Sequence, residues 1–383
     1  MNIHKNISCR PGVALLVVLI IVMTITITAL GFLSQSDVEL ACGANMLMRT
    51  QMDYLAESGL EHARGLILNP QDVNDPTYGY WRGGTGLKLV PAGNDCYDVA
   101  VIRDANDRCN YTIDCNSYRL DGAEKVGRSS LRAELRLDPC IAYWAGSNTT
   151  VWPQMTIKGD VYCGSMLTNN STLGIDGDVF AAGTISGTGT ITGRKNESVA
   201  TAYPVAWPNL AVGEFEPTYY IGSTLYSAEP NVPTAPFSPS AGNPAGVRYC
   251  IGDADIAGGV TISGTLVVTG KLTVSGANTI TAVKNFPALL VGGQVLMKNG
   301  GSLVINGLAQ IEQEITVDPN TTNANIDVTG GLFIHNGGVT SPSIVVNVTA
   351  DPAIASIEIW PGGTSKRWGP AAGAFFRSIE RVK

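Results

Sequence analysis

The chain has 383 residues, with 44 glycines, 20 prolines, 15% charged residues and a formal net charge of −7. This length allows two or three domains with a sizeable core. The high glycine content, without a Gly-X-Y period, excludes collagen and favours a turn-rich β protein. The acidic balance argues against nucleic-acid binding, which needs concentrated Lys and Arg.

An uninterrupted apolar segment, VALLVVLIIVMTITITALGFL, occupies residues 13–33 and carries no charge. At about 1.5 Å per residue, a helix of this length spans roughly 30 Å, the thickness of the hydrocarbon core of a bilayer. Lys5 and Arg10 precede the segment, and Asp37 and Glu39 follow it. The positive-inside rule therefore predicts a cytoplasmic N-terminus and an exported remainder.

The tripeptide Arg10-Pro11-Gly12 stands directly before the apolar segment. It resembles the leader of type IV pilins and type II secretion pseudopilins, which a prepilin peptidase cuts after the glycine. The resemblance implies that residues 1–12 are a leader peptide and that cleavage occurs between Gly12 and Val13. A plain single-pass anchor that meets no peptidase is the alternative.

The segment after the apolar run extends this resemblance. Residues 39–64, ELACGANMLMRTQMDYLAESGLEHAR, are similar to the N-terminal region of PilX-type minor pilins. The matching positions are Asn45, Arg49, Tyr54, Ala56, Glu57, Gly59, Leu60 and Ala63. The resemblance covers about residues 10–66 and implies that Glu57 belongs to the assembly region of the helix.

Val17 departs from the pattern of major pilins, which carry a glutamate at the fifth mature position. A buried carboxylate is costly unless it meets a partner, which in pilins is held to be the N-terminal amine of a neighbour. The K-type minor pseudopilin also lacks this glutamate and is taken to sit at the fibre tip. Val17 therefore favours a tip or initiator subunit over a shaft subunit.

Helical spacing of apolar residues continues beyond the membrane segment and predicts one helix over residues 13–66, roughly 80 Å long. Three strand-like segments follow at 96–104, 109–120 and 127–137, and the last alternates apolar with charged residues. This pattern predicts an antiparallel β-meander within residues 67–138.

Short β-favouring triplets, each closed by glycine, recur in the second half of the chain. IKGDV at 157–161 returns eighteen residues later as IDGDV at 175–179, and similar triplets recur every six residues within 262–276. An inward aliphatic residue, a polar residue and a corner glycine at this period predict a β-solenoid over residues 139–350. The predicted fold class is therefore mainly β, with a long N-terminal transmembrane helix, a small meander and a solenoid of either hand.

A proline-rich segment at 199–249 interrupts the repeats and holds eight of the twenty prolines. Proline at this density cannot join a central ladder, so we expect an excursion over a flank or an edge. Its aromatic residues leave a ligand or partner surface open as an alternative. We expect residues 351–383 to cap the last coil, because an uncapped solenoid exposes a sheet edge.

Six cysteines follow the apolar helix, at Cys96, Cys109, Cys115, Cys140, Cys163 and Cys250. They allow fifteen pairings. If the turn centres on Asn106, strand register places Cys96 across from Cys115 to within about one residue, whereas Cys109 and Cys115 share a strand too far apart to pair. We therefore predict a disulfide between Cys96 and Cys115.

The residues that usually carry catalysis are sparse. The three histidines are His4, His62 and His335, whose spacing predicts neither a metal site nor a catalytic triad. We expect no cofactor and no enzymatic activity.

The alternative is a membrane-anchored periplasmic β-helix protein that binds or cleaves polysaccharide, which would need neighbouring carboxylates. Asp176 with Asp178, and Asp253 with Asp255, are the close pairs in the repeats, and their i, i+2 spacing predicts a shared side of a strand. Calcium could bind there, although an Asp beside a turn glycine is commoner.

The resemblance implies a prepilin-like minor subunit of a type IV pilus or a type II secretion-like filament. Its partners would be other pilin or pseudopilin subunits, the prepilin peptidase and the inner membrane. The ectodomain would be periplasmic or displayed on the cell surface as part of a pilus. Whether the solenoid head binds a glycan, a surface or another subunit stays open.

Overall fold

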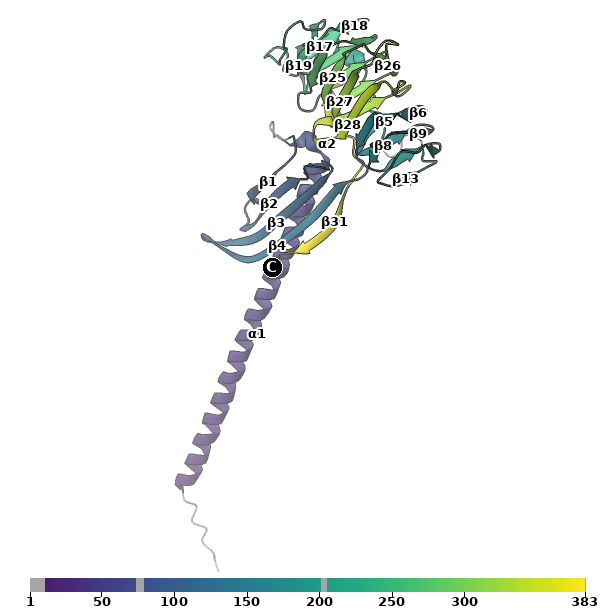
Figure 1. Ribbon diagram of the computed structural model, residues 1–383. Helices are drawn as coiled ribbons and strands as arrows, with labels where there is room; N and C mark the ends of the chain where they lie inside the picture. Colours follow the sequence, from purple (N-terminus) through teal and green to yellow (C-terminus); the bar gives the residue numbers. More distant parts are fainter. Residues whose placement is uncertain (1–10, 74–78, 201–204, 383) are drawn as a thin grey trace, which may run out of the picture.

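The computed structural model describes residues 11–73, 79–200 and 205–382. A long helix carries a small antiparallel sheet at its C-terminal end, and a β-solenoid lies beyond the sheet (Figure 1). This arrangement confirms the predicted fold class. The leader segment 1–10 lies outside the described residues.

Helix α1 runs from Pro11 to Leu68 as one element of 58 residues. The helix ends just before Pro70, because a proline disfavours helical backbone in the residue that precedes it. The side chain of Asn69 donates to the carbonyl of Gly65 at 2.9 Å and so satisfies one of the last free carbonyls. A short 3-10 turn, η1 (Pro70–Asp72), follows.

The sheet beside α1 has five described strands in the order β1-β2-β3-β4-β31, and every neighbouring pair is antiparallel. Their bounds are β1 (Gly83–Leu87), β2 (Asp95–Arg103), β3 (Asn110–Asp121), β4 (Glu124–Leu137) and β31 (Ala374–Arg381). Strands β2, β3 and β4 are the three that the sequence predicts. The outer two strands enlarge the predicted meander on both sides.

One stripe of α1 packs on this sheet. Met52, Ala56 and Ala63 are fully buried there, together with Ile113 and Leu135 from the sheet. These positions follow the three- and four-residue steps of an amphipathic helix, so the stripe faces a single layer. The second half of the helix is therefore part of the core of a small α/β unit.

We expect residues 351–383 to cap the solenoid, but the last strand of this segment, β31, returns to the sheet. Phe376 of β31 lies opposite Leu135 of β4, and Ile379 lies opposite Ala133. The edge of β4 would otherwise expose a row of unpaired backbone groups. The solenoid is consequently an insertion between two neighbouring strands of the sheet.

The solenoid is built from short parallel strands in two blocks. The first block comprises β5 (Ile141–Ala145), β6 (Thr149–Val151), β7 (Met155–Lys158), β8 (Asp160–Cys163), β9 (Leu167–Asn169), β10 (Ile175–Asp176), β11 (Val179–Ala181), β12 (Ile185–Ser186) and β13 (Lys195–Asn196). The second block comprises β17 (Val247–Cys250), β18 (Ala254–Ile256), β19 (Thr261–Ser263), β20 (Thr265–Val268), β21 (Leu272–Val274), β22 (Ala277–Thr281), β23 (Leu289–Val291), β24 (Val295–Met297), β25 (Ser302–Ile311), β26 (Ile315–Val317), β27 (Ala324–Ile334) and β28 (Ile344–Ala350).

The sequence repeat sets the register between coils. Ile157 pairs directly with Ile175, and Ile262 pairs with Ile280, so equivalent residues eighteen apart lie above one another. Gly159 turns one corner with φ +124°, and a Cβ there would lie 2.6 Å from the Cβ of Ala350 in the adjoining coil. Each coil of eighteen residues thus contains three short faces, as the six-residue period predicts.

The chain enters this stack in its middle. Along the main face the described strands follow the order β13-β11-β8-β5-β27-β25-β23-β20-β17-β16. The first block therefore grows outward from β5, and the second block starts at the opposite end and grows back toward it. The last coil needs no C-terminal cap, because β27 pairs with β5 and β28 pairs with β7.

The proline-rich excursion connects the two ends of the stack. It contains η2 (Val212–Phe215), β14 (Thr218–Ile221), β15 (Thr224–Ser227) and β16 (Glu229–Pro230), and residues 201–204 lie outside the described part. On the flank, the amide side chain of Gln310 exchanges two hydrogen bonds with the backbone of Leu210, at 2.9 and 3.2 Å. At the end of the stack, Phe237 forms an isolated bridge with Ile262. The excursion thus covers both a flank and one end.

The remaining C-terminal elements lead the chain back to the sheet. They are α2 (Pro352–Ala355), β29 (Ile357–Ile359), η3 (Pro361–Gly363) and β30 (Lys366–Trp368). The rings of Trp368 and Phe333 meet edge to face at 5.0 Å, which anchors this hairpin on the solenoid. Two backbone bonds, from Ile141 to Pro370 and from Asp138 to Gly373, then hold the outgoing chain beside the incoming one.

Candidate functional site

The first half of α1 is uncovered. Residues 13–47 are all exposed, with Val13 at 62% and Val17 at 47% of their full accessibility. Within the described residues, one helix is long and apolar enough to cross a membrane, and the mean hydropathy of its most apolar window is 3.0. The predicted processing residues Gly12 and Val13 lie in its first turn, and their role stays a prediction.

Three threonines interrupt the apolar segment without leaving a free hydroxyl. Thr24 donates to the carbonyl of Ile20 at 2.5 Å, Thr26 donates to Val22 at 2.8 Å, and Thr28 donates one turn back to Thr24. In a hydrocarbon environment, a polar group without a hydrogen-bond partner costs about 2 kcal/mol or more. Backbone carbonyls of the same helix therefore satisfy all three hydroxyl groups.

The segment that resembles minor pilins has two faces. Ala56 and Gly59 point toward the sheet and are buried, whereas Tyr54 and Glu57 are exposed, Tyr54 at 67%. Asn45 is exposed on the same helix, as are its neighbours. One face of the segment thus builds this subunit, and the other face is free. The assembly role of Val17 and Glu57 remains a prediction.

Gly59 marks the closest approach between helix and sheet. A Cβ at this position would lie 2.4 Å from Sγ of Cys115 and 2.9 Å from the ring of Tyr97. By contrast, a Cβ at Gly43 would meet nothing within 4 Å. The glycine of the AESGL sequence is therefore a packing residue.

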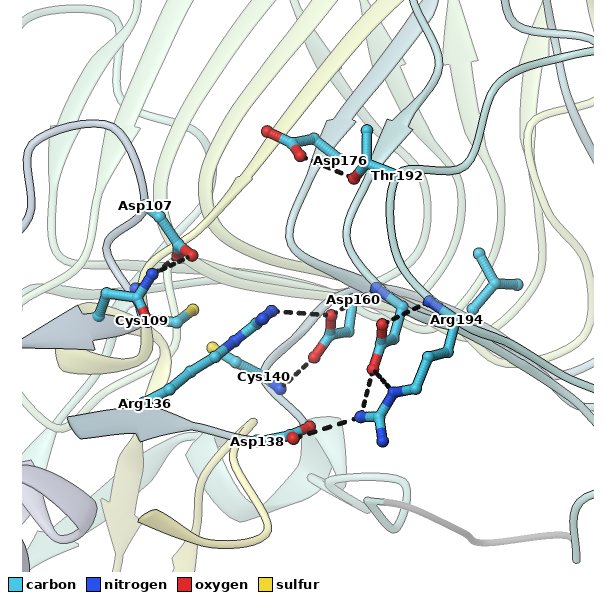
Figure 2. A network of polar contacts seen from close by, with 12 residues as sticks. Asp107, Cys109, Arg136, Asp138, Cys140, Asp160, Asp176, Thr192 and Arg194 are labelled. Carbon is cyan, nitrogen blue, oxygen red and sulfur yellow. Dashed lines mark hydrogen bonds and ion pairs between the residues drawn. The ribbon is translucent and has the colours of Figure 1, made fainter. Parts of the chain in front are cut away.

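A polar network joins the sheet to the first coils of the solenoid (Figure 2). Arg136 of β4 points toward Asp160 at the start of β8, with Nη2 3.5 Å from Oδ1. Arg194 binds Asp178 through its backbone amide at 2.7 Å and its Nε at 2.8 Å, and it reaches Asp138 at 3.3 Å. Residues from the sheet and from two coils are thereby held together.

Asp160 is fully buried and accepts two backbone hydrogen bonds. Cys140 donates to its Oδ2 at 2.7 Å, and Asp178 donates to its Oδ1 at 2.8 Å. Burial raises the pKa of Asp160 to about 6, although the two backbone amides and Arg136 act in the opposite direction. The carboxylate therefore serves as a structural acceptor between the sheet and successive coils.

Asp351 makes a second ionic link across the same junction. Its two oxygens bind Arg103 at 2.8 Å and Arg108 at 2.7 Å, and its own side chain is 2% exposed. It also caps helix α2 by accepting a hydrogen bond from the amide of Ala353 at 3.2 Å. One buried carboxylate thus ties the end of β2 and the turn before β3 to the end of the last coil.

In each pair considered for polysaccharide chemistry, at least one carboxylate binds a residue of a later coil. Asp178 is buried and accepts hydrogen bonds from Arg194. Burial alone would raise its pKa, but the hydrogen bonds from Arg194 outweigh this effect and lower the pKa. Asp253 accepts the amide of Lys271, eighteen residues on, at 2.8 Å.

The predicted shared side is wrong for Asp176 and Asp178, because strand β10 ends at Asp176 and the chain turns at Gly177. Asp176 is exposed and accepts a hydrogen bond from Thr192 at 2.8 Å, whereas Asp178 is buried. No group of three or more metal-ligating side chains occurs among the residues that the structure describes.

The strand register does not bring Cys96 and Cys115 together. Cys96 lies opposite Tyr118, and Cys115 lies opposite Val99. Cys115 therefore faces α1, whereas Cys96 lies on the other face of the sheet. Arg103 pairs with Tyr111, so the turn centres on Asp107, one residue later than Asn106, and the register is shifted accordingly.

The aromatic residues of the excursion pack inward. Phe215 and Tyr219 are buried, and the hydroxyl of Tyr219 donates to Asn243 at 2.8 Å. Trp207 stacks on His335 at 4.6 Å and lies beside Trp144. These side chains fix the excursion to the flank of the solenoid.

Sequence reasoning missed Arg136, Asp160 and Asp351. The repeated GDV sequence was a usable signal for Asp160, because Asp178 recurs at the equivalent place and each accepts an amide from a later coil. No local pattern marks Asp351, whose partners are more than 240 residues away in the sequence.

Comparison with known proteins does not establish a family for this chain. No protein-family model and no curated protein matches the chain. Among solved structures, the competence-associated pilin ComZ from Thermus thermophilus aligns with 88% of this chain and 98% of its own, at 14% identity. The TM-score of that alignment is 0.23, which does not establish a common fold.

Proposed function

We propose that the chain is a non-enzymatic, prepilin-like minor subunit of a type IV pilus or a related secretion filament. The observation that carries this proposal is the division of α1. Its second half is packed on the sheet, while residues 13–47 are bare. An apolar helix half that its own subunit leaves uncovered is buried by the membrane before assembly and by the helices of neighbouring subunits in the filament.

The length of the bare segment favours assembly over simple anchoring. Its 35 residues span about 50 Å as a helix, whereas the hydrocarbon core of a bilayer is about 30 Å thick. The excess carries large apolar side chains at Val38, Leu40, Met46 and Leu47, exposed by 60, 70, 73 and 62%. A bilayer that covers residues 13–33 leaves these side chains in water, so a neighbouring subunit is the occupant that buries them.

A place at or near the tip is the more specific part of the proposal. Val17 removes the carboxylate that a shaft helix would offer to its neighbour, as the resemblance implies. The solenoid lies at the end of the molecule remote from the N-terminus of α1 (Figure 1). A head of this size, inserted into the sheet, would crowd a densely packed shaft and is accommodated at an end.

The test is the N-terminal mass of the protein from membranes of cells with and without a co-expressed prepilin peptidase. The proposal predicts a peptidase-dependent start at Val13. A Gly12→Val variant should keep Met1 in both strains, which controls for unrelated proteolysis. An intact Met1 in the unaltered chain with active peptidase would reduce the protein to an anchored solenoid.

A further inference from the structure

Two cysteines from different parts of the fold meet where the sheet joins the solenoid. Cys109 precedes β3, and Cys140 lies between β4 and β5. Both are free thiols in the structure, and both are 1% exposed. They belong to the continuous apolar cluster that runs from the sheet into the first coil.

The two thiols are in contact. Each thiol shifts the pKa of the other, and Figure 2 shows their sulfur atoms side by side near Asp107. Contact with Cys140, followed by burial, raises the pKa of the Cys109 thiol well above its usual value. A pair of neutral thiols in this position is inert once the protein is folded.

The backbone holds both residues in place. Cys109 donates to Asp107 at 3.0 Å and accepts the amide of Leu137 at 2.9 Å. Cys140 donates to Asp160 at 2.7 Å and accepts its amide at 3.0 Å. The relative position of the two sulfurs is therefore set by the sheet and by the first two coils together.

We propose that Cys109 and Cys140 form a disulfide that ties the sheet to the inserted solenoid. The proposal rests on the proposed function, because export brings the chain into an oxidising compartment. The two thiols lose two protons and two electrons, and a sulfur–sulfur bond forms between them. A thiol–disulfide oxidoreductase or oxidised glutathione accepts the electrons as its own disulfide is reduced to two thiols.

The location gives the bond a role. The incoming chain at residues 138–140 and the outgoing chain at 370–373 run side by side, joined by a bridge between Cys140 and Ala371. A disulfide from Cys140 to Cys109 fastens this pair of crossings to the start of β3. Force on the solenoid would then pass into a third strand of the sheet.

Other pairings are less favourable. Cys96 and Cys115 lie on opposite faces of the sheet, and Cys163 donates to backbone carbonyls within the solenoid, those of Ser147 and Met166. Because the Cys109 and Cys140 thiols are buried in the folded chain, oxidation has to accompany folding.

Peptide mapping of the full chain without reduction tests the pairing. Membranes are treated with an alkylating agent, and the protein is cleaved before aspartate. Cleavage at Asp107, Asp114, Asp138 and Asp160 places Cys109, Cys115 and Cys140 on three separate peptides. We expect the peptide 107–113 to be linked to the peptide 138–159, and the link to disappear on reduction.

A second preparation separates this inference from the export that it assumes. The reduced, unfolded full chain is refolded in detergent with a mixture of reduced and oxidised glutathione, which supplies the oxidant directly. The linked peptide in this sample supports the pairing even if both thiols are alkylated in protein from cells, in which case the export part of the proposed function fails. Alkylation of both thiols in the refolded protein would overturn the pairing.

Substitution variants complete the test. Cys109→Ser and Cys140→Ser should each abolish the linked peptide, whereas Cys96→Ser should leave it unchanged. A linked peptide that persists in Cys140→Ser would show that Cys109 has a different partner. A link that is lost in Cys96→Ser would equally contradict the proposal.

Discussion

Single aspartates at the solenoid corners hold neighbouring coils together. Asp160 accepts the amide of Asp178, Asp178 accepts that of Arg194, and Asp253 accepts that of Lys271. Each carboxylate thus replaces, at a corner, the backbone bond that the strands make along each face. Asp160 and Asp178 are buried acceptors, and a hydrogen bond to a charged group of this kind contributes about 1.5–3 kcal/mol, whereas Asp253 is exposed.

The pH dependence of stability should report the burial of Asp160. Its pKa is raised from 3.8 to about 6, so the folded state holds the proton more tightly than the unfolded chain. The resulting stabilisation is complete below pH 3.8 and is lost as the pH rises through 6. Relative to an Asp160→Asn variant, the unaltered chain should lose roughly 3 kcal/mol over this window. Urea unfolding of both proteins in detergent at each pH measures the difference, and parallel profiles would contradict the assignment.

Gly59 gives a test of helix–sheet packing. Gly59→Ala places a methyl 2.4 Å from Sγ of Cys115, and overpacking of this kind costs about 1–3 kcal/mol. Gly43→Ala is the matched control, because nothing lies within 4 Å and alanine is the better helix former. Thermal unfolding in detergent should show a lower midpoint for the first variant alone. Equal midpoints would mean that α1 is not seated on the sheet as described.

At the scale of elements, local patterns predict the elements and not their partners. The helix follows from its apolar run and spacing, and β2, β3 and β4 follow from alternation. Strand β31 was missed because AFFRSIER has only weak alternation and its partner β4 lies beyond the whole inserted solenoid. The six-residue repeat likewise predicts the coil, but it does not predict that the first coil stacks on the last.

Removal of β31 tests the insertion topology. A chain that ends at Gly373 loses the strand that pairs with β4 along Leu131–Leu137, which exposes backbone groups on that edge. Hydrogen exchange of β4 amides should become faster, while amides of β20 and β21 in the solenoid keep their rates. Unchanged exchange in β4 would show that β31 does not belong to the sheet.

The link between Asp351 and its two arginines joins separate elements. Asp351→Asn removes the buried counter-charge of Arg103 and Arg108, which are themselves 18% and 36% exposed, so we expect a loss of about 1.5–3 kcal/mol. Asp253→Asn removes an exposed carboxylate and should give no measurable change in unfolding. Denaturant unfolding of the two variants distinguishes these cases, and a small effect at Asp351 would refute its role at the junction.

At the scale of the whole molecule, insertion of the solenoid separates the part that is displayed from the helix segment that we assign to the membrane and to assembly. The helix and sheet form a unit whose free helix half points away from the solenoid (Figure 1). The two chain crossings lie together at the far end of the sheet, and Asp160, Asp351 and the cysteine pair fix them there. The solenoid can therefore be displayed without contact with the segment that we assign to membrane insertion and assembly.

The most direct measurement is the copy number of the protein in filaments sheared from cells, together with its position along them by antibody labelling. The tip-subunit proposal predicts a few copies in each filament, with label at one end, and it predicts loss of the protein from filaments when Gly12→Val blocks processing. Label along the whole shaft at the stoichiometry of the major subunit would contradict the tip position. Absence from filaments, with all of the protein retained in the membrane, would contradict the filament subunit itself.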